Sequence, residues 1–437
     1  DKHRHFDQAT KLKNVFYDIR GPVTATAGAV TTDTTVVKAL RRIRTPQTQR
    51  NRELGLLLFA FLINGAAVAL VQLGATGHID WTFLYYCGGL TVLVLGLHIV
   101  LRYRAPQADP FVVPIATVLS GLGLAMIYRI DIGRSISGWE ALSTRQLVWL
   151  GIALAGAVAL VLALRNYRVL FRYTYVSGLA GVVLLLLPFV PGLGVEAGAD
   201  VWISIGGIFS FQPGELAKIC LAIFFAGYLV QTRDVLSIAG RKVLGITFPR
   251  GRDLGPILVA WVMSVGVLVL QTDLGTSLLL FGLFVAMLYI ATERVSWIVL
   301  GLTLAAGGAY VAYQLFGHLQ QRVALWLDPF DPGQSDQVAK GLMGMAAGGM
   351  MGTGLGRGRP DINYLPFSDM IFPALGEELG LVGLFAILCL YALLVERGMR
   401  TAIGLRDGFG KLLAAGLAFI VALQVFVTVG GVTRVIP

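Results

Sequence analysis

Long apolar runs, separated by short polar segments, make up most of this chain. About eleven of these runs reach roughly 17–25 residues, the length of a helix that crosses a hydrocarbon core about 30 Å thick. Because a bilayer offers backbone groups no other partner, we expect each run to be helical. The predicted spans are residues 54–75, 81–101, 111–130, 146–164, 171–190, 213–230, 254–271, 274–292, 296–316, 371–395 and 411–431.

The composition indicates the same fold class. Of the 437 residues, 56% are hydrophobic and 14% are charged, and the mean hydropathy is +0.74. These values are typical of an all-α polytopic integral membrane protein. The net charge of +10 therefore predicts contact with membrane lipids and no nucleic-acid partner. Cys87, Cys220 and Cys389 lie within apolar runs, which predicts free packing thiols.

A polar, mostly basic segment of 52 residues precedes the first span. A cleavable signal peptide would place an apolar run much nearer the start, so we expect none. Residues 10–23, TKLKNVFYDIRGPV, resemble the opening of alanine-type aminotransferases, but nothing else of that family follows. The expected organisation is a foreign or disordered cytoplasmic tail at 1–52, two membrane helices at 53–103 and a helical core at 111–437.

The distribution of basic residues predicts the orientation. If the tail is cytoplasmic, the connections on its side and residues 31–52 hold about 21 Lys and Arg side chains, against about eight on the other side. Cytoplasmic loops of membrane proteins carry such an excess. We therefore expect a multi-pass protein of the cytoplasmic membrane, with a cytoplasmic N-terminus and the long loop at residues 317–370 outside the cell.

That loop is the most unusual segment of the chain. It is about fifty residues long, and loops of that length without structure of their own are usually functional or disordered. Its Trp, Phe, Met and Tyr content argues against disorder. We therefore expect the chemistry here. The loop carries five aspartates: Asp328, Asp331, Asp336, Asp361 and Asp369.

Ionisable residues at the ends of spans are further candidates, because burying a charge in a membrane is costly. Glu215 and Lys218 lie in FQPGELAKI at the predicted outer end of the sixth span. Their i, i+3 spacing places both on one helix face, where they can pair. A purely structural ion pair and a substrate contact are both compatible with this pattern.

Other polar residues near the spans have ordinary alternatives. Gln271 and Asp273 lie in LQTDLGTS, a tight turn in which Asp273 either caps the next helix or contacts a ligand. Glu377 and Glu378 lie about a turn inside the tenth span and need partners or an aqueous cavity. His98 has no second histidine nearby, so we expect no metal role for it.

The run GTGLGRG at 352–358 superficially matches a nucleotide-binding loop. No strand precedes it and no βαβ unit surrounds it, so that interpretation fails. Its glycines are more consistent with tight turns or with close backbone approach.

Several stretches together resemble one family, the SEDS (shape, elongation, division and sporulation) glycosyltransferases of the FtsW, RodA and SpoVE type. They are FQPGELAK, QTDLGTSLLL, RVALWLDPFDPG, GTGLG, YLPFSDMIFPALGEELGLVG and VTVGGVTRVIP, in the family's order over residues 111–437. The two additional N-terminal spans and the stretches DLGPILVAWVMSVGV and RTAIGLRDGFGKLLAAGL are most similar to actinobacterial RodA.

The resemblance implies a peptidoglycan glycosyltransferase that polymerises lipid II into glycan strands on the outer face of the membrane during cell elongation. It also implies a class B penicillin-binding protein, a transpeptidase, as partner. The family core has ten helices. Residues 111–431 supply nine of them, and the tenth, with its S-Y-G-G-S motif, is absent from this sequence.

The family's essential aspartate lies in the second D-P of the long loop, which corresponds to Asp331. As a hypothesis, Asp331 is the general base for the acceptor hydroxyl in an inverting transfer, and the leaving group is a polyprenyl diphosphate. Asp328, in the first D-P, is less important in the family. Cationic side chains, with or without a divalent ion such as Mg²⁺ or Mn²⁺, would stabilise the diphosphate.

In this hypothesis, Ser368, Asp369 and Glu377 line the cavity beneath the long loop. Lys218 is the first candidate for the diphosphate, followed by Arg145, Arg357 and Arg359. The predicted substrate-binding residues are Lys218, Glu215, Gln271, Asp273, Ser368, Asp369, Glu377 and Arg145.

Two other functions stay open. Buried charges in a many-helix protein also fit a flippase or transporter of lipid-linked precursors. Transporters, however, tend to bind their substrates near the bilayer midplane, whereas the polar residues here cluster at the outer ends of the spans. A non-catalytic scaffold of a cell-wall complex is the third interpretation.

Overall fold

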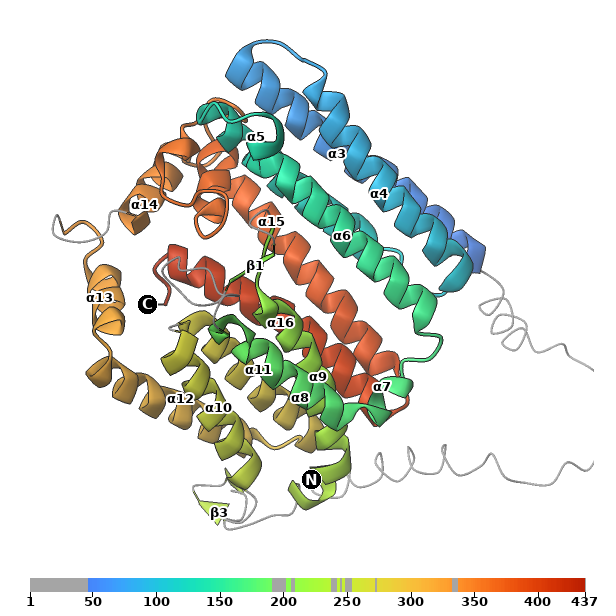
Figure 1. Ribbon diagram of the computed structural model, residues 1–437, viewed down its shortest axis with the longest axis vertical. Helices are drawn as coiled ribbons and strands as arrows, with labels where there is room; N and C mark the ends of the chain where they lie inside the picture. Colours follow the sequence, from blue (N-terminus) through green and yellow to red (C-terminus); the bar gives the residue numbers. More distant parts are fainter. Residues whose placement is uncertain are drawn as a thin grey trace, which may run out of the picture. The chain divides into compact units, whose positions relative to one another are not determined.

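A computed structural model of the chain describes residues 46–190, 202–205, 209–236, 242–243, 246–247, 254–271, 273–331 and 337–436 (Figure 1). Most of the tail expected at 1–52 therefore lies outside the described residues. The contact pattern separates residues 1–46 from residues 47–437, and only the second unit is described below.

Helices account for nearly all of the described secondary structure. The long helices are α3 (Pro46–Thr76), α4 (Thr82–Arg104), α5 (Val112–Gly133), α6 (Leu142–Ala163), α8 (Thr174–Leu186), α9 (Pro213–Leu236), α10 (Gly255–Gln271), α11 (Leu274–Thr292), α12 (Val295–Leu315), α13 (Gly317–Leu327), α14 (Gln337–Gly348), α15 (Ile371–Gly404) and α16 (Gly408–Val432). Short elements are α7 (Val169–Arg172), η1 (Gly138–Glu140), η2 (Leu187–Phe189) and η4 (Pro360–Ile362).

Two short antiparallel ladders complete the described elements. Strand β1 (Ile203–Ile205) pairs with β2 (Phe209–Phe211), with Ile203 opposite Phe211. Strand β3 (Lys242–Val243) pairs with β4 (Ile246–Thr247). Neither ladder was predicted, because runs of two or three residues carry no clear period in the sequence.

The predicted membrane architecture is confirmed. Within the described residues, 9 helices are long and apolar enough to cross a bilayer, and two shorter apolar helices cover Thr174–Phe189 and Gly255–Val267. Together they fall at the eleven predicted spans, and the two shorter ones correspond to the spans expected at 171–190 and 254–271. The chain is an all-α, multi-pass membrane protein.

Small residues let the helices of the core approach one another closely. Gly282 of α11 packs against Leu423 of α16, and Gly416 of α16 packs against Met287 of α11. Around this contact, buried side chains from α9, α10, α11, α12 and α16 form the largest apolar cluster. Since lipid is as apolar as these side chains, close packing of this kind is what holds membrane helices together.

Helix α15 is broken near its start, and a glycine-rich segment fills the break. Gly380 has a left-handed backbone (φ +70°) inside the helix. The N–H groups of Leu381 and Val382 donate to the carbonyls of residues 349 and 350, at 2.9 and 3.1 Å. In return, the N–H groups of residues 353 and 354 donate to the carbonyls of residues 377 and 378, both at 3.0 Å. We call residues 349–358 the glycine segment.

The glycine segment behaves as the sequence predicted. Gly352, Gly354 and Gly356 all have positive φ, at +82°, +97° and +84°, a conformation that glycine adopts without steric cost. A side chain at Gly352 would collide with the carbonyl of Glu378. Tight turns and close backbone approach, not phosphate binding, explain these glycines.

Residues 317–370, which the sequence predicts as one long polar loop, contain helices. This segment contains the helices α13 and α14 and the short η4. Each helix buries only a narrow face, as Leu319 does in α13 and Ala339 in α14. A hydropathy search for long apolar runs therefore passes over both.

The two N-terminal spans make polar contacts with the core and with each other. Asn64 of α3 donates to the carbonyl of Thr117 in α5 at 2.8 Å. Glu53 of α3, which also pairs with Arg50, accepts from His98 of α4 at 2.7 Å. His98, for which no metal role was expected, therefore belongs to a buried ion-pair cluster.

At its other end, α3 meets the glycine segment. Gly74 of α3 lies so close to Leu355 and Gly356 that a Cβ atom would collide with the Leu355 carbonyl oxygen. We predict that Gly74→Val lowers the free energy of unfolding by about 1–3 kcal/mol, the usual cost of overpacking. Thermal unfolding of the purified protein in detergent measures the loss.

The control is Gly65→Val in the same helix. No atom lies within 4 Å of a Cβ placed at Gly65, so this change should leave the midpoint nearly unaltered. Equal losses in both variants would contradict the proposed close contact.

Candidate functional site

The predicted pair of Glu215 and Lys218 is confirmed. Both lie in the first turn and a half of α9, and Lys218 Nζ is 2.8 Å from Glu215 Oε1. The Lys218 side chain is only 5% exposed, whereas that of Glu215 is 49% exposed. Burial of the ammonium group requires an anion beside it, because an unpaired charge in an apolar surrounding is very costly.

Glu215 and Arg145 line the same cavity, which we call the polar cavity. This polar cavity has a volume of 380 Å³ and is also lined by Gln146, Trp149, Trp202, Phe211, Gln212 and Phe367. The structure therefore brings together two residues that the sequence separates by two helices. Phe367 belongs to the segment between η4 and α15, so that segment forms part of the wall.

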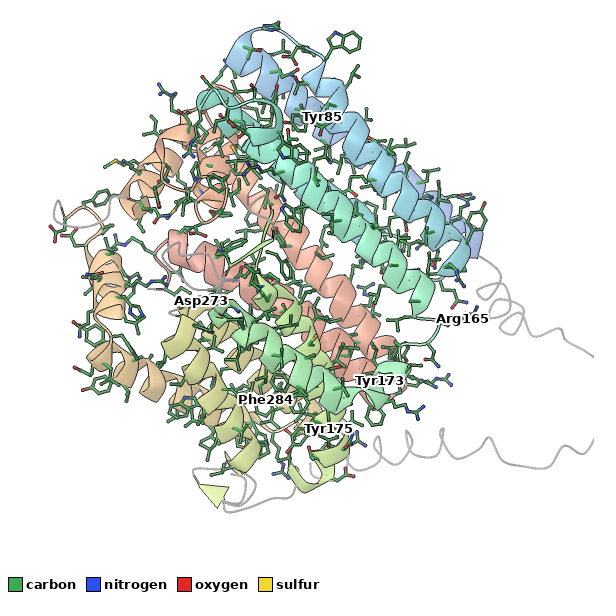
Figure 2. The ribbon with its side chains drawn as sticks, in the orientation of Figure 1. Tyr85, Arg165, Tyr173, Tyr175, Asp273 and Phe284 are labelled. Carbon is green, nitrogen blue, oxygen red and sulfur yellow. The ribbon has the colours of Figure 1, made fainter. Side chains whose placement is uncertain are left out.

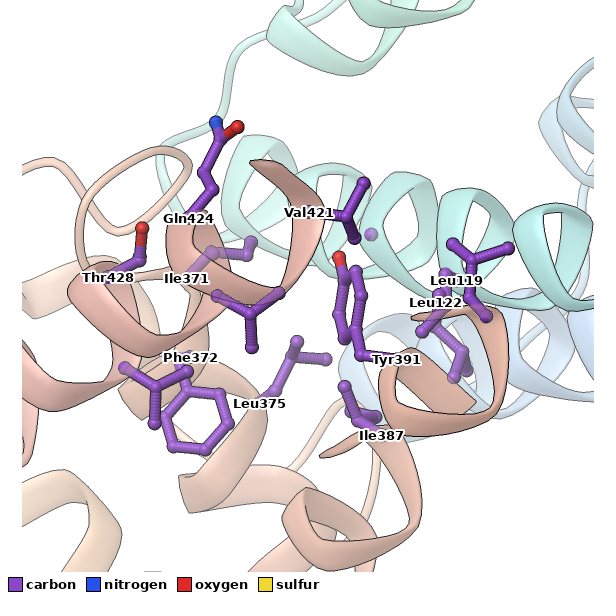
Figure 3. A pocket seen from close by; sticks show the side chains of 14 residues that line it. Leu119, Leu122, Ile371, Phe372, Leu375, Ile387, Tyr391, Val421, Gln424 and Thr428 are labelled. Carbon is purple, nitrogen blue, oxygen red and sulfur yellow. The ribbon is translucent and has the colours of Figure 1, made fainter. Parts of the chain in front are cut away.

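A second cavity, which is apolar, lies between α5, α15 and α16. It has a volume of 500 Å³ and is lined mainly by Leu, Ile, Val and Phe side chains (Figure 3). Its polar groups include Gln424 and Thr428 of α16. Gln424 Oε1 lies 3.4 Å from Lys218 Nζ, so Lys218 stands between the apolar cavity and the polar cavity.

Asp331 lies just beyond α13, on an exposed stretch. Its neighbour Asp328 accepts a hydrogen bond from the N–H of Phe330 at 3.1 Å, which forms a turn between the two aspartates. No local pattern in the sequence indicates how this turn is anchored. The segment that follows it, residues 332–336, lies outside the described residues, and with it Asp336.

The anchor is Arg434, at the end of α16. Its Nε and one terminal nitrogen donate to the carbonyl of Trp326 at 2.9 and 2.6 Å, and the terminal nitrogen also donates to the carbonyl of Leu327 at 2.9 Å. Trp326 Nε1 returns a bond to the Arg434 carbonyl at 3.0 Å. A cation on the last carbonyls of a helix is favourable. These bonds hold the end of α13, and hence the start of the Asp331 turn, against the core.

Asp273 caps a helix, the ordinary alternative that the sequence left open. Its carboxylate accepts from the N–H and the hydroxyl of Thr276 at 3.1 and 2.6 Å, at the start of α11 (Figure 2). Its negative charge also reaches Asp369. Contact of Asp273 with a substrate stays a prediction.

Asp369 has a perturbed acidity. Partial burial raises the pKa of this carboxyl group, the nearby Arg322 of α13 lowers it, and the charge of Asp273 raises it. The net effect is a raised pKa. Asp369 therefore lies in an electrostatic cluster formed by three segments that are far apart in the sequence.

Ser368 and Gln271 are the two other predicted substrate-binding residues. Ser368 is exposed next to Asp369. Gln271 is the last residue of α10, and its side chain lies outside the described residues. Their roles stay predictions.

Glu377 does not line the polar cavity. Its Oε1 accepts from the N–H of Arg359 at 2.6 Å. With Lys340 and Arg359 it lines a separate cavity of 260 Å³ between α14 and α15. Arg359 is therefore close to Glu377 rather than to Lys218.

The most deeply buried charge pair of this region, Arg129 with Glu378, was not predicted. Arg129 of α5 donates from Nε to Glu378 Oε1 at 3.0 Å and from a terminal nitrogen to the carbonyl of Gly358 at 2.5 Å. Glu378 Oε2 accepts from the N–H of Gly356 at 2.9 Å. The signal was present, because Arg129 and Glu378 both lie in predicted spans and had to find opposite charges.

Within the described ranges, no group of three or more His, Cys, Asp or Glu side chains could hold a metal ion. The three cysteines are free thiols, as predicted.

The chain is similar to known proteins over most of its length. The profile of the FtsW, RodA and SpoVE family of cell cycle proteins matches residues 111–437. The chain is 47% identical over 398 residues to "Peptidoglycan glycosyltransferase RodA" of Mycobacterium tuberculosis, a match that covers 89% of this chain and 84% of the relative. It is 32% identical over 344 residues to a "Probable peptidoglycan glycosyltransferase FtsW" of Geobacter sp., with coverage of 76% and 89%. A chain from the solved structure of a peptidoglycan synthase complex aligns at 24% identity and a TM-score of 0.49, over 82% of this chain and 88% of that chain.

We predict that Arg129→Met destabilises the protein by about 3–5 kcal/mol, because it leaves the Glu378 carboxylate buried without its cation. Chemical unfolding in detergent measures the change. The control is Arg400→Met, which breaks an i, i+4 pair with Glu396 in which the two side chains are 67% and 40% exposed and should cost about 0–1 kcal/mol. A similar, small loss in both variants would contradict the assignment of Arg129 as a buried partner.

The raised pKa of Asp369 gives a prediction about pH. A carboxyl group whose pKa rises on folding favours the folded state below its unfolded pKa of about 3.9, and that contribution is lost as the pH rises through the folded pKa. Asp369→Asn should therefore unfold at a higher temperature than the parent protein at pH 7. The difference should shrink as the pH falls towards 4. Ser368→Ala adds and removes no titrating group, so its effect should not vary with pH; a pH-independent effect of Asp369→Asn would disprove the idea.

Proposed function

Because the chain belongs to the FtsW, RodA and SpoVE family, we propose that it polymerises lipid II with Asp331 as general base. The extent of the family match and the 47% identity to a mycobacterial RodA make the chain a peptidoglycan glycosyltransferase of the elongation type. The observation that carries the residue assignments is the position of Lys218, which contacts Glu215 at the polar cavity and Gln424 at the apolar cavity.

This position fits the substrate of the proposed reaction. A lipid-linked sugar diphosphate has an apolar tail, two phosphates and a polar sugar, in that order. The apolar cavity of 500 Å³ is suited to part of the tail, and the polar cavity beside Arg145 and Glu215 is suited to the sugars. Lys218, between them, would hold the diphosphate and stabilise the charge that develops as it leaves.

Asp331 would remove the proton from the acceptor hydroxyl as that oxygen attacks the anomeric carbon of the donor sugar. On its exposed turn, the Asp331 carboxylate would meet a substrate that arrives from water. The Arg434 bonds to the end of α13 support this role, since a base must be held within hydrogen-bonding distance of its proton. The leaving diphosphate needs no general acid, and attack from the face opposite it inverts the anomeric centre.

The orientation of the proposed reaction follows from the basic residues. The excess of Lys and Arg on the side of the N-terminal segment supports a cytoplasmic N-terminus and a polar cavity that opens on the outer face. The segment after η4 contributes Phe367 to that cavity, and Arg134, at the end of α5, donates to the carbonyl of Asn363 in the same segment at 3.2 Å. Lipid II delivered to the outer leaflet would meet the cavity there.

Two further parts of the proposal concern partners. A divalent cation would have to arrive with the diphosphate, because the described residues contain no preformed cluster of ligands and phosphate-bound Mg²⁺ needs only one or two protein carboxylates. A class B penicillin-binding protein would supply the transpeptidase activity. Polymer yield with and without a chelator tests the first, and co-purification of the two proteins tests the second.

We predict that Asp331→Asn lowers the rate of polymerisation of purified lipid II about 10²–10⁴-fold, the usual contribution of a general base. Asp328→Asn, which alters the same turn without removing the proposed base, is the matched control and should be much milder. Gel analysis of the polymer measures both rates.

A folded Asp331→Asn protein with a rate near that of the parent would refute the assignment of the base. Movement of lipid II across reconstituted vesicles without any polymer would instead support the flippase alternative.

A further inference from the structure

A further cavity, larger than those described above, is formed by the two N-terminal spans and the core, and its lining residues are distinct from those of the polar cavity. It has a volume of 730 Å³ and lies between the start of α4 and the loop that joins α5 to α6. We call it the aromatic cavity, because Trp81, Tyr85, Tyr86, Tyr128 and Trp139 line it. Its α4 wall falls outside residues 111–437, the part matched by the family profile.

Three of the tyrosine rings of the cavity are in contact, and other aromatic side chains that line it are exposed. Tyr86 contacts Tyr85 and Tyr128, at centroid distances of 5.1 and 4.8 Å. Trp81 is 84% exposed and Tyr85 is 48% exposed (Figure 2 labels Tyr85). Trp139, on the opposite wall, is 54% exposed. Tyr86 and Tyr128 are buried, at 3% and 8%, so the exposed ring surface of the cavity comes from Trp81, Tyr85 and Trp139.

The two carboxylates of the cavity are already used by the fold. Asp131 accepts from the N–H groups of Leu142 and Ser143 at 3.1 and 2.8 Å, at the start of α6. Asp80 accepts from the N–H of Thr82 at 3.0 Å, at the start of α4, and from Gln72 at 2.6 Å. The helix N-termini offset part of both charges, which weakens their attraction for a cation.

The rest of the lining excludes an anion. Among the described residues that line the cavity there is no Lys, Arg or His. Hydroxyl groups are abundant instead, including those of Ser135, Ser137 and Thr144. Flat apolar faces surrounded by neutral hydrogen-bonding groups match an uncharged molecule that has both apolar C–H faces and many hydroxyls, which is the chemistry of a sugar ring.

A belt of Trp and Tyr at the membrane surface would also place aromatic rings near this level. A belt, however, requires rings that face the lipid, and it does not require a hydroxyl-lined hollow between helices. The aromatic cavity also adjoins the segment that borders the reaction site. Arg134, next to the cavity residue Ser135, donates to the carbonyl of Asn363 at 3.2 Å.

We propose that the aromatic cavity binds uncharged sugar units of the growing glycan strand. This inference rests on the proposed function, since a polymerase releases a chain of sugars at this end of the molecule. The two N-terminal spans would then retain the product between rounds of addition, so that each strand grows longer before it dissociates.

The first test uses binding alone. The full-length Asp331→Ala protein, in detergent, is titrated with the neutral tetrasaccharide of N-acetylglucosamine, and tryptophan fluorescence is recorded. We expect saturable binding that weakens about tenfold, which corresponds to about 1.4 kcal/mol, when Trp81→Ala and Tyr85→Ala remove two aromatic contacts. The matched control is Tyr103→Ala, an 80% exposed ring at the other end of α4, which should leave the affinity unchanged.

Three results would overturn the proposal: no saturable response, an equal loss with Tyr103→Ala, or binding of tetralysine in place of the saccharide. The last would assign the cavity to a basic protein segment.

The second test uses the polymer. With Asp331 intact, the Trp81→Ala and Tyr85→Ala protein should consume lipid II at an initial rate within about twofold of the parent and yield strands several-fold shorter. Strands of unchanged length would also overturn the proposal. Because the saccharide titration needs no turnover, failure of the proposed function would appear in the Asp331 variants and would leave the binding result intact.

Discussion

The buried pair of Arg129 and Glu378 is the constraint on which this part of the molecule depends. Two charges in the apolar interior are tolerated only if each hydrogen-bonding group finds a partner, and here the glycine segment provides the remaining partners. Glu378 accepts from Gly356, and Arg129 donates to Gly358. The pair therefore joins α5 to α15 and fixes the glycine segment between them.

The position of the glycine segment in turn determines the shape of α15 and the place where α3 packs on the core. The break at Gly380 frees backbone groups that would be unsatisfied in a membrane, and residues 349–354 satisfy them. Gly74 of α3 packs against Leu355 and Gly356 of the same segment. The two N-terminal spans are thus joined to the core through the segment that also holds the ion pair.

The sequence predicts those features whose cause is local. Hydropathy places the spans, the i, i+3 spacing pairs Glu215 with Lys218, and Asp273 before Gly275 and Thr276 indicates a helix cap. Features that need two distant segments are beyond such reasoning: Arg129 and Glu378 are 249 residues apart, and nothing local connects Arg434 with Trp326. The helices α13 and α14 were missed for a different reason, since a short amphipathic helix within a polar region resembles a loop when only long apolar runs are sought.

The unequal exposure of Glu215 and Lys218 bears on how the proposed site would accept a substrate. Lys218 is 5% exposed and cannot leave its apolar surroundings, whereas Glu215 is 49% exposed at the wall of the polar cavity. In the proposed reaction, a diphosphate beside Lys218 would repel the Glu215 carboxylate, which can turn into water at little cost. The ammonium group would exchange one anion for another and would never be left buried without a partner. An ion pair with one mobile member is therefore suited to anion binding, because the charge needed in the complex is already desolvated and balanced before the substrate arrives.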